Sequence, residues 1–210
     1  MTFPPPTPPV IGGTPANHSG RNNHPITRVV IHSAVMENRV GAARLLGSWN
    51  RAGTTGGSWH YAVDADQVFQ CSFDSFVCWH APPNTHSIGI EMADRPTAGS
   101  GVPAAAPPGR ARAAAQARWR ASIVRWTTPR HRRMLRRTAR LTAELCLAYD
   151  LPLVLLTVEG ARAGRKGIAT HDVVSDAFGQ SSHWDPGAWP SKKFLRMVRS
   201  YAKKMKENTP

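Results

Sequence analysis

The sequence is poor in cysteine and in acidic residues, and it has no long hydrophobic run. Its 3 cysteines among 210 residues are too few for a disulfide scaffold in a chain of this size. Cys71 and Cys78 are close enough to pair across a turn, but free thiols are the preferred interpretation. No stretch approaches the ~18 uninterrupted apolar residues of a spanning helix, so no transmembrane segment is expected.

The N-terminus lacks the basic and apolar regions of a secretory signal, because it begins Met-Thr-Phe-Pro-Pro-Pro. We therefore expect synthesis in the cytoplasm and another export route for any extracytoplasmic action. Acidic residues number 13 against 27 Lys and Arg, which gives a formal net charge of +14. This charge predicts a polyanionic partner, namely nucleic acid, acidic lipid or an anionic cell-wall polymer, and does not choose among them.

The apolar sequence that is present suffices for one core. Hydrophobic residues make up 41% of the chain, and 210 residues at ~150 per domain indicate one domain with elaborations. Short apolar runs predict strands, and three-four spacing predicts helices. The expected strands lie at 29–31, 60–63, 68–71, 88–92 and 153–157, and the expected helices at 38–50, 129–148 and from 191 onward. This alternation predicts an α/β fold with a central mixed β-sheet flanked by α-helices in a single domain.

Two of these helices carry further signals. In the first, Val40, Ala43, Leu46 (or Leu45) and Trp49 recur at helical spacing and are expected to face the sheet. In the second, a threonine N-cap at 128 is followed by proline at the first helical position.

Composition divides the chain into a core and its appendages. Residues 1–25 form a Pro/Gly-rich N-terminal arm, either docked or mobile, and 26–205 form the main domain. Within that domain, the Ala/Pro/Arg-rich stretch from about 95 to 126 is expected to be a surface insertion with at most a short helix. Residues 206–210 read as a polar tail or the start of a linker.

Several polar side chains stand where apolar strands end or where loops carry turn residues. His32 closes the first strand, His171 follows an apolar Gly-Ile-Ala-Thr segment, and Asp185 lies 14 positions later in Asp-Pro-Gly. Two imidazoles and one carboxylate suit a zinc ion with three protein ligands and a fourth position for water. Taken singly they are weak indicators, because a histidine at a strand end is more often structural and Asp-Pro-Gly is an ordinary turn.

Together these segments resemble the zinc-dependent N-acetylmuramoyl-L-alanine amidases of type 2, a family that includes phage endolysins, wall-recycling amidases and peptidoglycan recognition proteins. The resemblance covers roughly residues 27 to 202. Val-Val-Ile-His-Ser, with His32, is similar to the family's first strand, whose histidine is a zinc ligand. Thr-His-Asp-Val, with His171, is similar to the segment of the second ligand, and Asp185 matches the third. The resemblance thus implies Zn²⁺ on these three residues and makes 26–205 an amidase catalytic domain.

The resemblance also implies the other site residues. Ser-Ile-Gly-Ile-Glu, ending at Glu91, is similar to the strand that bears a catalytic glutamate. His183 occupies the place where members carry Lys or His beside the scissile amide. Trp79 and His80, in Trp-His-Ala, match a segment that lines the substrate groove. Trp59 is also expected to bind substrate. It stands where some phage amidases carry a tyrosine thought to assist catalysis, so Glu91 is expected to make a larger contribution to catalysis here.

The implied reaction is hydrolysis of the amide between N-acetylmuramic acid and the L-alanine of the stem peptide by zinc-activated water. Glu91 would take the proton of that water and deliver it to the leaving amine, and His183 would stabilise the oxyanion. The likeness is greatest to amidase modules of endolysins from phages of mycobacteria and relatives. We therefore expect a monomer, made in the host cytoplasm, that acts on peptidoglycan in the bacterial cell wall during host lysis, an antimicrobial activity.

Two other functions stay open at this point. A basic nucleic-acid-binding protein is one, since an arginine-rich helix binds phosphates, although no motif for specific nucleic-acid recognition is present. That helix carries Arg130, Arg132, Arg133, Arg136, Arg137 and Arg140. A non-catalytic peptidoglycan-binding module is the other, and retention of the three ligands with Glu91 favours the enzyme. Glu91 itself has a structural alternative, a buried ion pair, because such pairs mimic active sites.

Overall fold

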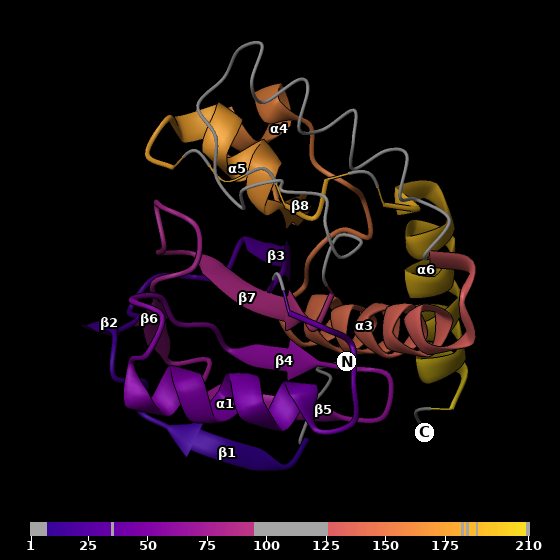
Figure 1. The fold of residues 1–210 in the computed structure, drawn as a ribbon. Helices are drawn as coiled ribbons and strands as arrows, with labels where there is room; N and C mark the ends of the chain where they lie inside the picture. The colour runs from indigo at the N-terminus through magenta and orange to yellow at the C-terminus, as the bar shows by residue number, and fades with distance from the viewer. Residues whose placement is uncertain are drawn as a thin grey trace, which may run out of the picture.

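The computed structural model describes residues 8–34, 36–94, 126–181, 183, 185–187 and 189–208, which build helices around a six-stranded sheet (Figure 1). The strands are β1 (Val10–Gly13), β2 (His18–Arg21), β3 (Arg28–Ser33), β4 (Tyr61–Val63), β5 (Val68–Ser72), β6 (Phe76–Cys78), β7 (Ser87–Met92) and β8 (Gly167–Thr170). The helices are α1 (Ala42–Ala52), α3 (Pro129–Ala148), α4 (Val158–Arg162), α5 (His171–Phe178) and α6 (Ser191–Glu207).

The sheet is mixed, as the sequence predicts. Its strand order is β1-β5-β4-β7-β3-β8, with β4, β7, β3 and β8 parallel and β5 antiparallel to β4. β2 and β6 form a separate antiparallel pair. Because β3, β7 and β8 run in the same direction, their carboxyl ends meet at one edge of the sheet. In α/β folds this edge is where functional residues gather.

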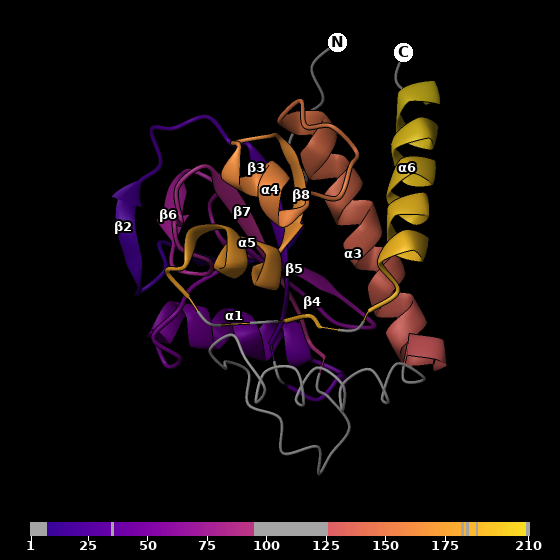
Figure 2. The same ribbon diagram turned by 90° about the horizontal axis from the view of Figure 1, so that it is seen from above.

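Helices cover both faces of the sheet. On one face, α3 and α6 lie side by side and bury the main hydrophobic core, in which Phe194 and Met134 are fully enclosed (Figure 2). On the other face, α1 packs over β4 and β5, while α4 and α5 pack over β3 and β8. The single-domain α/β architecture with a flanked central sheet is therefore confirmed.

Strand alternation decides which face carries the polar residues. Val29 and Ile31 point into the core under α3 and α6, whereas Val30 belongs to the cluster under α4 and α5. His32 follows Val30 by two positions and so shares its face. In the β3–β7 register His32 stands opposite Glu91, which puts both side chains next to each other at the carboxyl edge.

The two helices with the clearest sequence signals are confirmed, and the first helix needs a correction. α3 begins at Pro129 behind the Thr128 cap, and α6 begins at Ser191. α1 starts only at Ala42, so the prediction that Val40 faces the sheet is wrong: Val40 precedes the helix and is 72% exposed. Gly41, with a φ of 78°, adopts a left-handed conformation that stops the helix from extending back to residue 38.

The strand predicted at 153–157 is also wrong, because only Leu155 pairs with the sheet, through a single bridge to Ile168. Thr157 caps α4 by accepting a hydrogen bond from the Gly160 amide, which ends the extended segment. Strands β1 and β2, within the predicted arm, and β6 were not predicted, because segments of four, four and three residues are too short to give a clear pattern. Helix α6 continues two residues into the predicted tail.

Other predictions concern the insertion and the thiols. The insertion at about 95–126 lies outside the described residues except for Trp126, which is buried in the core with α3. Cys71, Cys78 and Cys146 are buried and free, in agreement with the preferred interpretation.

The Thr128 cap gives the first testable prediction. The Thr128 hydroxyl accepts a hydrogen bond from the backbone amide of His131 at the start of α3. Thr128→Ala leaves that amide without its cap and should lower the free energy of unfolding by about 1 kcal/mol in urea titrations. Thr54→Ala removes an exposed threonine hydroxyl outside any cap and should change stability by less than ~0.5 kcal/mol. Equal effects of the two variants would contradict the capping role.

Candidate metal centre and active site

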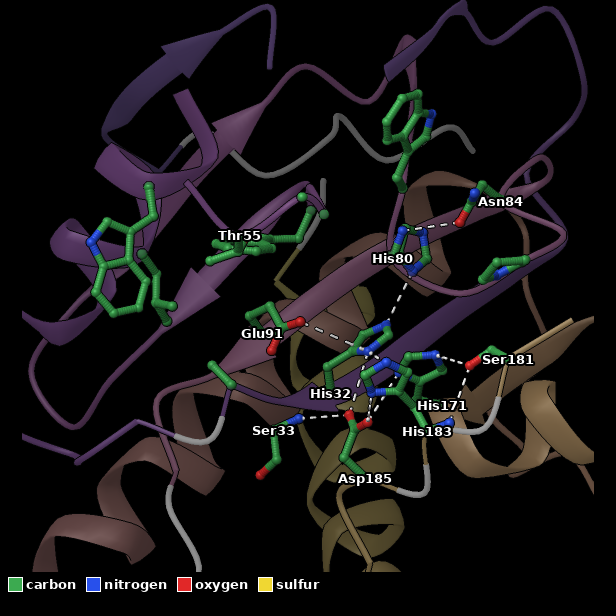
Figure 3. Close-up of a pocket in the computed structure, with 18 of the residues that line it drawn as sticks. His32, Ser33, Thr55, His80, Asn84, Glu91, His171, Ser181, His183 and Asp185 are labelled. Atoms are coloured by element: carbon green, nitrogen blue, oxygen red, sulfur yellow. Dashed lines mark hydrogen bonds and ion pairs between the residues drawn. The ribbon is translucent and has the colours of Figure 1, made fainter. Parts of the chain in front are cut away.

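Three buried side chains from separate elements converge at the carboxyl edge of the sheet. His32 is the penultimate residue of β3, His171 is the first residue of α5, and Asp185 lies in the segment between α5 and α6. Their ligand atoms lie within 4.8 Å of one another (Figure 3). His32 Nδ1 is 3.1 Å from His171 Nδ1 and 3.4 Å from Asp185 Oδ2, and His171 Nδ1 is 3.0 Å from Asp185 Oδ1. The structure thus brings together the three residues predicted to bind zinc.

Each of these three side chains also has a hydrogen-bond partner outside the cluster. His32 Nε2 lies 3.0 Å from His80 Nδ1, and His171 Nε2 lies 3.1 Å from the Ser181 hydroxyl. The backbone amide of Ser33 donates to Asp185 Oδ2 at 3.0 Å. Anchoring of this kind fixes ring orientation and is typical of metal ligands.

Electrostatics in this cluster favours neutral imidazole beside carboxylate. Burial, aided by the neighbouring His171, lowers the pKa of His32 to about 4, so its ring is neutral at pH 7. Burial acts to raise the pKa of Asp185, but the two imidazoles outweigh it and hold that pKa well below its ordinary value. A neutral imidazole with a free lone pair and an ionised carboxylate are the forms that bind metal ions.

Glu91 lies beside this cluster on the neighbouring strand. Its Oε1 is 3.8 Å from His32 Nδ1, and its buried Oε2 has no hydrogen-bond partner among the described residues. Burial, with a further contribution from Asp185, raises the pKa of Glu91 well above its ordinary value. Among the described residues Glu91 lies next to the neutral His32 and makes no ion pair with an arginine, which disfavours the structural alternative considered from sequence.

His183 stands at the mouth of the cluster. Its ring stacks on that of His171, with centroids 4.7 Å apart and planes 8° apart, and its side chain is 45% exposed. Nδ1 is 3.9 Å from Asp185 Oδ1. Burial, together with His171, lowers the pKa of His183, so its ring can offer a neutral N–H donor at the solvent side.

These groups open into a cavity of about 580 Å³. The three side chains predicted to bind substrate, Trp59, Trp79 and His80, all line it. They differ in exposure, since Trp59 and His80 are buried whereas Trp79 is 42% exposed and donates from Nε1 to the Ser19 hydroxyl. Lining residues that were not predicted as site residues include Leu46, Trp49, Thr55, Asn84, Gln180 and Ser181. Leu46 and Trp49 had a sequence signal, as inward positions of the first helix; the others lie in loops or are too common in type to stand out.

Solved structures share this architecture at low sequence identity. Staphylococcus aureus hydrolase AmiA matches with a TM-score of 0.62 and 14% identity over 99% of this chain and 89% of that one. A mutant endolysin from Bacillus subtilis matches with a TM-score of 0.56 and 16% identity, covering 94% of this chain and 99% of that one. PlyL matches with a TM-score of 0.55 and 15% identity over 93% and 99% of the two chains. At these identities the comparison establishes the fold alone.

The family follows from the sequence profile rather than from these structures. Residues 22–188, which include His32, Glu91, His171 and Asp185, match the N-acetylmuramoyl-L-alanine amidase family Amidase_2. The chain therefore belongs to this family and is an enzyme of the amidase class. No curated protein matches it at a significant level.

Proposed function

We propose that this enzyme hydrolyses the amide bond between N-acetylmuramic acid and the L-alanine of the peptidoglycan stem peptide, with zinc as its cofactor. The observation that carries the proposal is the convergence of His32 Nδ1, His171 Nδ1 and Asp185 Oδ1 beside Glu91 at the floor of a cavity. The family membership supports the same reaction.

The donor set fits zinc. Two imidazole nitrogens and one carboxylate oxygen are ligands that zinc takes in catalytic sites, where three protein groups leave one position open. His32 Nδ1 and His171 Nδ1 lie 3.4 and 3.0 Å from the two carboxylate oxygens of Asp185, so the three donor groups are close enough to share one ion. When bound, zinc supplies an electrophile that acidifies water and polarises the scissile carbonyl.

Residues around the three ligands are placed to transfer protons, stabilise the oxyanion and bind the substrate. We assign Glu91 as the general base that accepts the proton of the attacking water on its partnerless Oε2 and later gives it to the leaving amine. A raised pKa suits this role, because the carboxylate must release as well as take up the proton. His183, half-exposed above His171, is placed to donate a hydrogen bond to the oxyanion. Trp79, Trp59 and the His80 segment would hold the sugar and peptide in the cavity.

Mass spectrometry of the products tests this proposal. Purified protein loaded with zinc is incubated with peptidoglycan, and a second sample is treated with a chelator and then reloaded. We expect released peptides with new free L-alanine amino termini, lost on chelation and restored by zinc. Intact peptidoglycan despite bound zinc would instead indicate a non-catalytic peptidoglycan-binding module, and cleavage elsewhere would refute the assigned bond.

We further propose that the protein is an endolysin of the type found in phages of mycobacteria and relatives. The structural likeness to endolysins supports the general type. In this role it would be made in the host cytoplasm and act on the cell wall as a monomer during host lysis. Among the described residues, no helix has the length and hydrophobicity to cross a membrane.

A further inference from the structure

His80 has a different relation to the site from the one that its sequence context suggests. It lies behind His32 with only 7% of its surface exposed, in the connection between β6 and β7 (Figure 3). The two rings are nearly perpendicular, at 84°, and His80 Nδ1 is 3.0 Å from His32 Nε2. A nitrogen at this distance forms a hydrogen bond whose direction depends on which ring carries the proton.

The partners of His80 determine that direction. The Ser87 hydroxyl donates its single hydrogen to the Asn84 carbonyl at 2.9 Å. His80 Nε2, 3.1 Å from the same hydroxyl oxygen, must therefore be the donor in that contact. The ring of His80 packs against two other imidazoles, His32 and His60, and its Nδ1 faces His32 Nε2. A neutral ring with its hydrogen on Nε2 has an acceptor at Nδ1.

It follows that His32 Nε2 donates to His80 Nδ1, and that His32 Nδ1 keeps its lone pair on the side of His171 and Asp185. We propose that His80 is a positioning residue: the relay from Asn84 through Ser87 and His80 fixes the tautomer of His32 and so selects Nδ1 as its ligating atom. This inference rests on the proposed zinc site and names the residue that prepares it.

The surrounding backbone is built to hold this ring. Asn84 Oδ1 accepts hydrogen bonds from the backbone amides of His80 and Ala81, both at 2.9 Å, which fixes the segment that carries the imidazole. Gly89 on β7 lies under the ring, and a Cβ there would come within 2.7 Å of it. Glycine at this strand position therefore makes room for His80 against the sheet.

Ring-nitrogen NMR of the zinc-free protein tests the relay independently of activity. We expect His32 to show the Nε2–H tautomer in the wild type and in His80→Gln, because the glutamine carbonyl can accept from His32 while its amide donates to Ser87. His80→Ala should give mixed tautomers and about 10- to 100-fold weaker zinc binding in chelator competition. Ser87→Ala keeps both imidazole rings but removes the hydroxyl that His80 donates to, so it should also give mixed tautomers of His32. This variant replaces His80→Ala in the test if His80→Ala fails to fold.

His60→Gln is the matched control, since this buried imidazole touches His80 but has no hydrogen bond to His32. It should leave the His32 tautomer and zinc affinity unchanged. An Nδ1–H tautomer of wild-type His32, or unchanged tautomer and affinity in His80→Ala, would overturn the proposal. Absence of zinc binding by a wild-type protein with the expected tautomer would instead count against the proposed function, so the two failures are distinguishable.

A second inference comes from the distribution of charge. Helix α3 carries six arginines and one glutamate, and α6 carries seven lysines and arginines and one glutamate. Thirteen basic and two acidic side chains give these helices a formal charge of +11, against +14 for the whole chain. Both helices cover the face of the sheet opposite to the cavity. Among the residues that the structure describes, the excess positive charge thus lies away from the proposed catalytic centre.

The exposed part of this layer, here called the basic face, includes Arg132, Arg133 and Arg136 on α3 and Lys192, Arg196 and Lys206 on α6, all exposed. None of the six makes an ion pair within the part of the chain that the structure describes. The α6 positions recur along one side of the helix over ~21 Å at 1.5 Å per residue. The large hydrophobic side chains found exposed in the described segments lie outside both helices, which disfavours insertion into a lipid bilayer.

We propose that the basic face binds a phosphate-bearing anionic polymer of the cell wall while the opposite face engages the stem peptide. A row of exposed cations complements a polymer with repeated anionic groups, and arginine binds phosphate through two parallel hydrogen bonds. This proposal rests on the proposed function, because it assumes that the protein acts at the cell wall. The positive charge of the basic face is observed independently of that assumption.

Sedimentation with insoluble cell walls tests this surface. The triple variant Arg132→Gln, Arg133→Gln, Arg136→Gln should bind walls at least ~10-fold more weakly at moderate salt. Its control, Arg39→Gln, Arg44→Gln, Arg51→Gln, removes the same charge from exposed positions around α1 and should bind like the wild type. Walls stripped chemically of phosphate polymers should bind all three proteins equally, and hydrolysis of a soluble fragment should not change.

Equal weakening by both triple variants would overturn the proposal, because it would mean that only net charge matters. Equal binding of the wild type to intact and stripped walls would do the same. Tighter binding to duplex DNA than to intact walls, lost in the α3 variant, would assign the basic face to nucleic acid.

Discussion

Glu91→Gln is expected to lower kcat for stem-peptide release by about 10²- to 10⁴-fold, the contribution typical of a general base. Glutamine retains the volume of the side chain but cannot accept the proton of the attacking water. Glu91 makes no ion pair with Lys or Arg among the described residues, so the substitution leaves no cation unpaired. Because burial disfavours the ionised carboxylate, the variant should unfold at the same or a higher denaturant concentration.

The measurement is kcat on a soluble muropeptide together with zinc content and urea unfolding. Glu144→Gln, which loses a partly exposed carboxylate paired with Arg140 on α3, is the matched control and should retain wild-type turnover. A Glu91→Gln enzyme that keeps more than a tenth of the wild-type kcat would show that another group takes the proton. Loss of zinc along with activity would assign Glu91 to metal binding instead.

The sequence allowed prediction of the elements whose signals are local. Pro129 behind Thr128, and the apolar run around Val30, specify a helix start and a buried strand by their own chemistry. Strand β1 could not be found in this way, because it forms by pairing with the distant β5 and not through a pattern of its own. Leu155 shows the opposite error: its surroundings are apolar enough for a strand, yet the cap at Thr157 starts a helix first.

Prediction of the site depended on combining segments that are far apart in the chain. His32, His171 and Asp185 were each ambiguous, and only the family resemblance joined them before their side chains were seen to converge. The residues that hydrogen-bond to the histidines could not be predicted from the sequence, because Ser181 and Ser87 are ordinary polar residues whose roles come from the atoms they contact. The parallel register, which places His32 opposite Glu91, is likewise a property of the sheet and not of either strand.

Asp185→Asn is expected to weaken zinc binding by more than ~100-fold and to abolish hydrolysis at stoichiometric zinc. The loss should exceed the 10- to 100-fold effect of removing a group that only supports a ligand, because the one anionic ligand is lost. Asparagine can still accept the hydrogen bond from the Ser33 amide, so the loop retains that anchor. Asp176→Asn, an equal charge change at an exposed position on α5, should bind zinc like the wild type.

Zinc-dependent stabilisation is the decisive measurement, because Asp185 also affects the metal-free protein. Its carboxylate lies 3.0 Å from His171 Nδ1, so the asparagine variant loses this charge-assisted contact even without zinc and should melt at a lower temperature. Comparing each protein with and without zinc removes this common term, since the free energy of stabilisation that zinc adds is set by the ratio of zinc concentration to Kd. A wild-type rise that is absent in Asp185→Asn places zinc on this carboxylate, whereas an equal rise in both proteins would mean that zinc binds elsewhere.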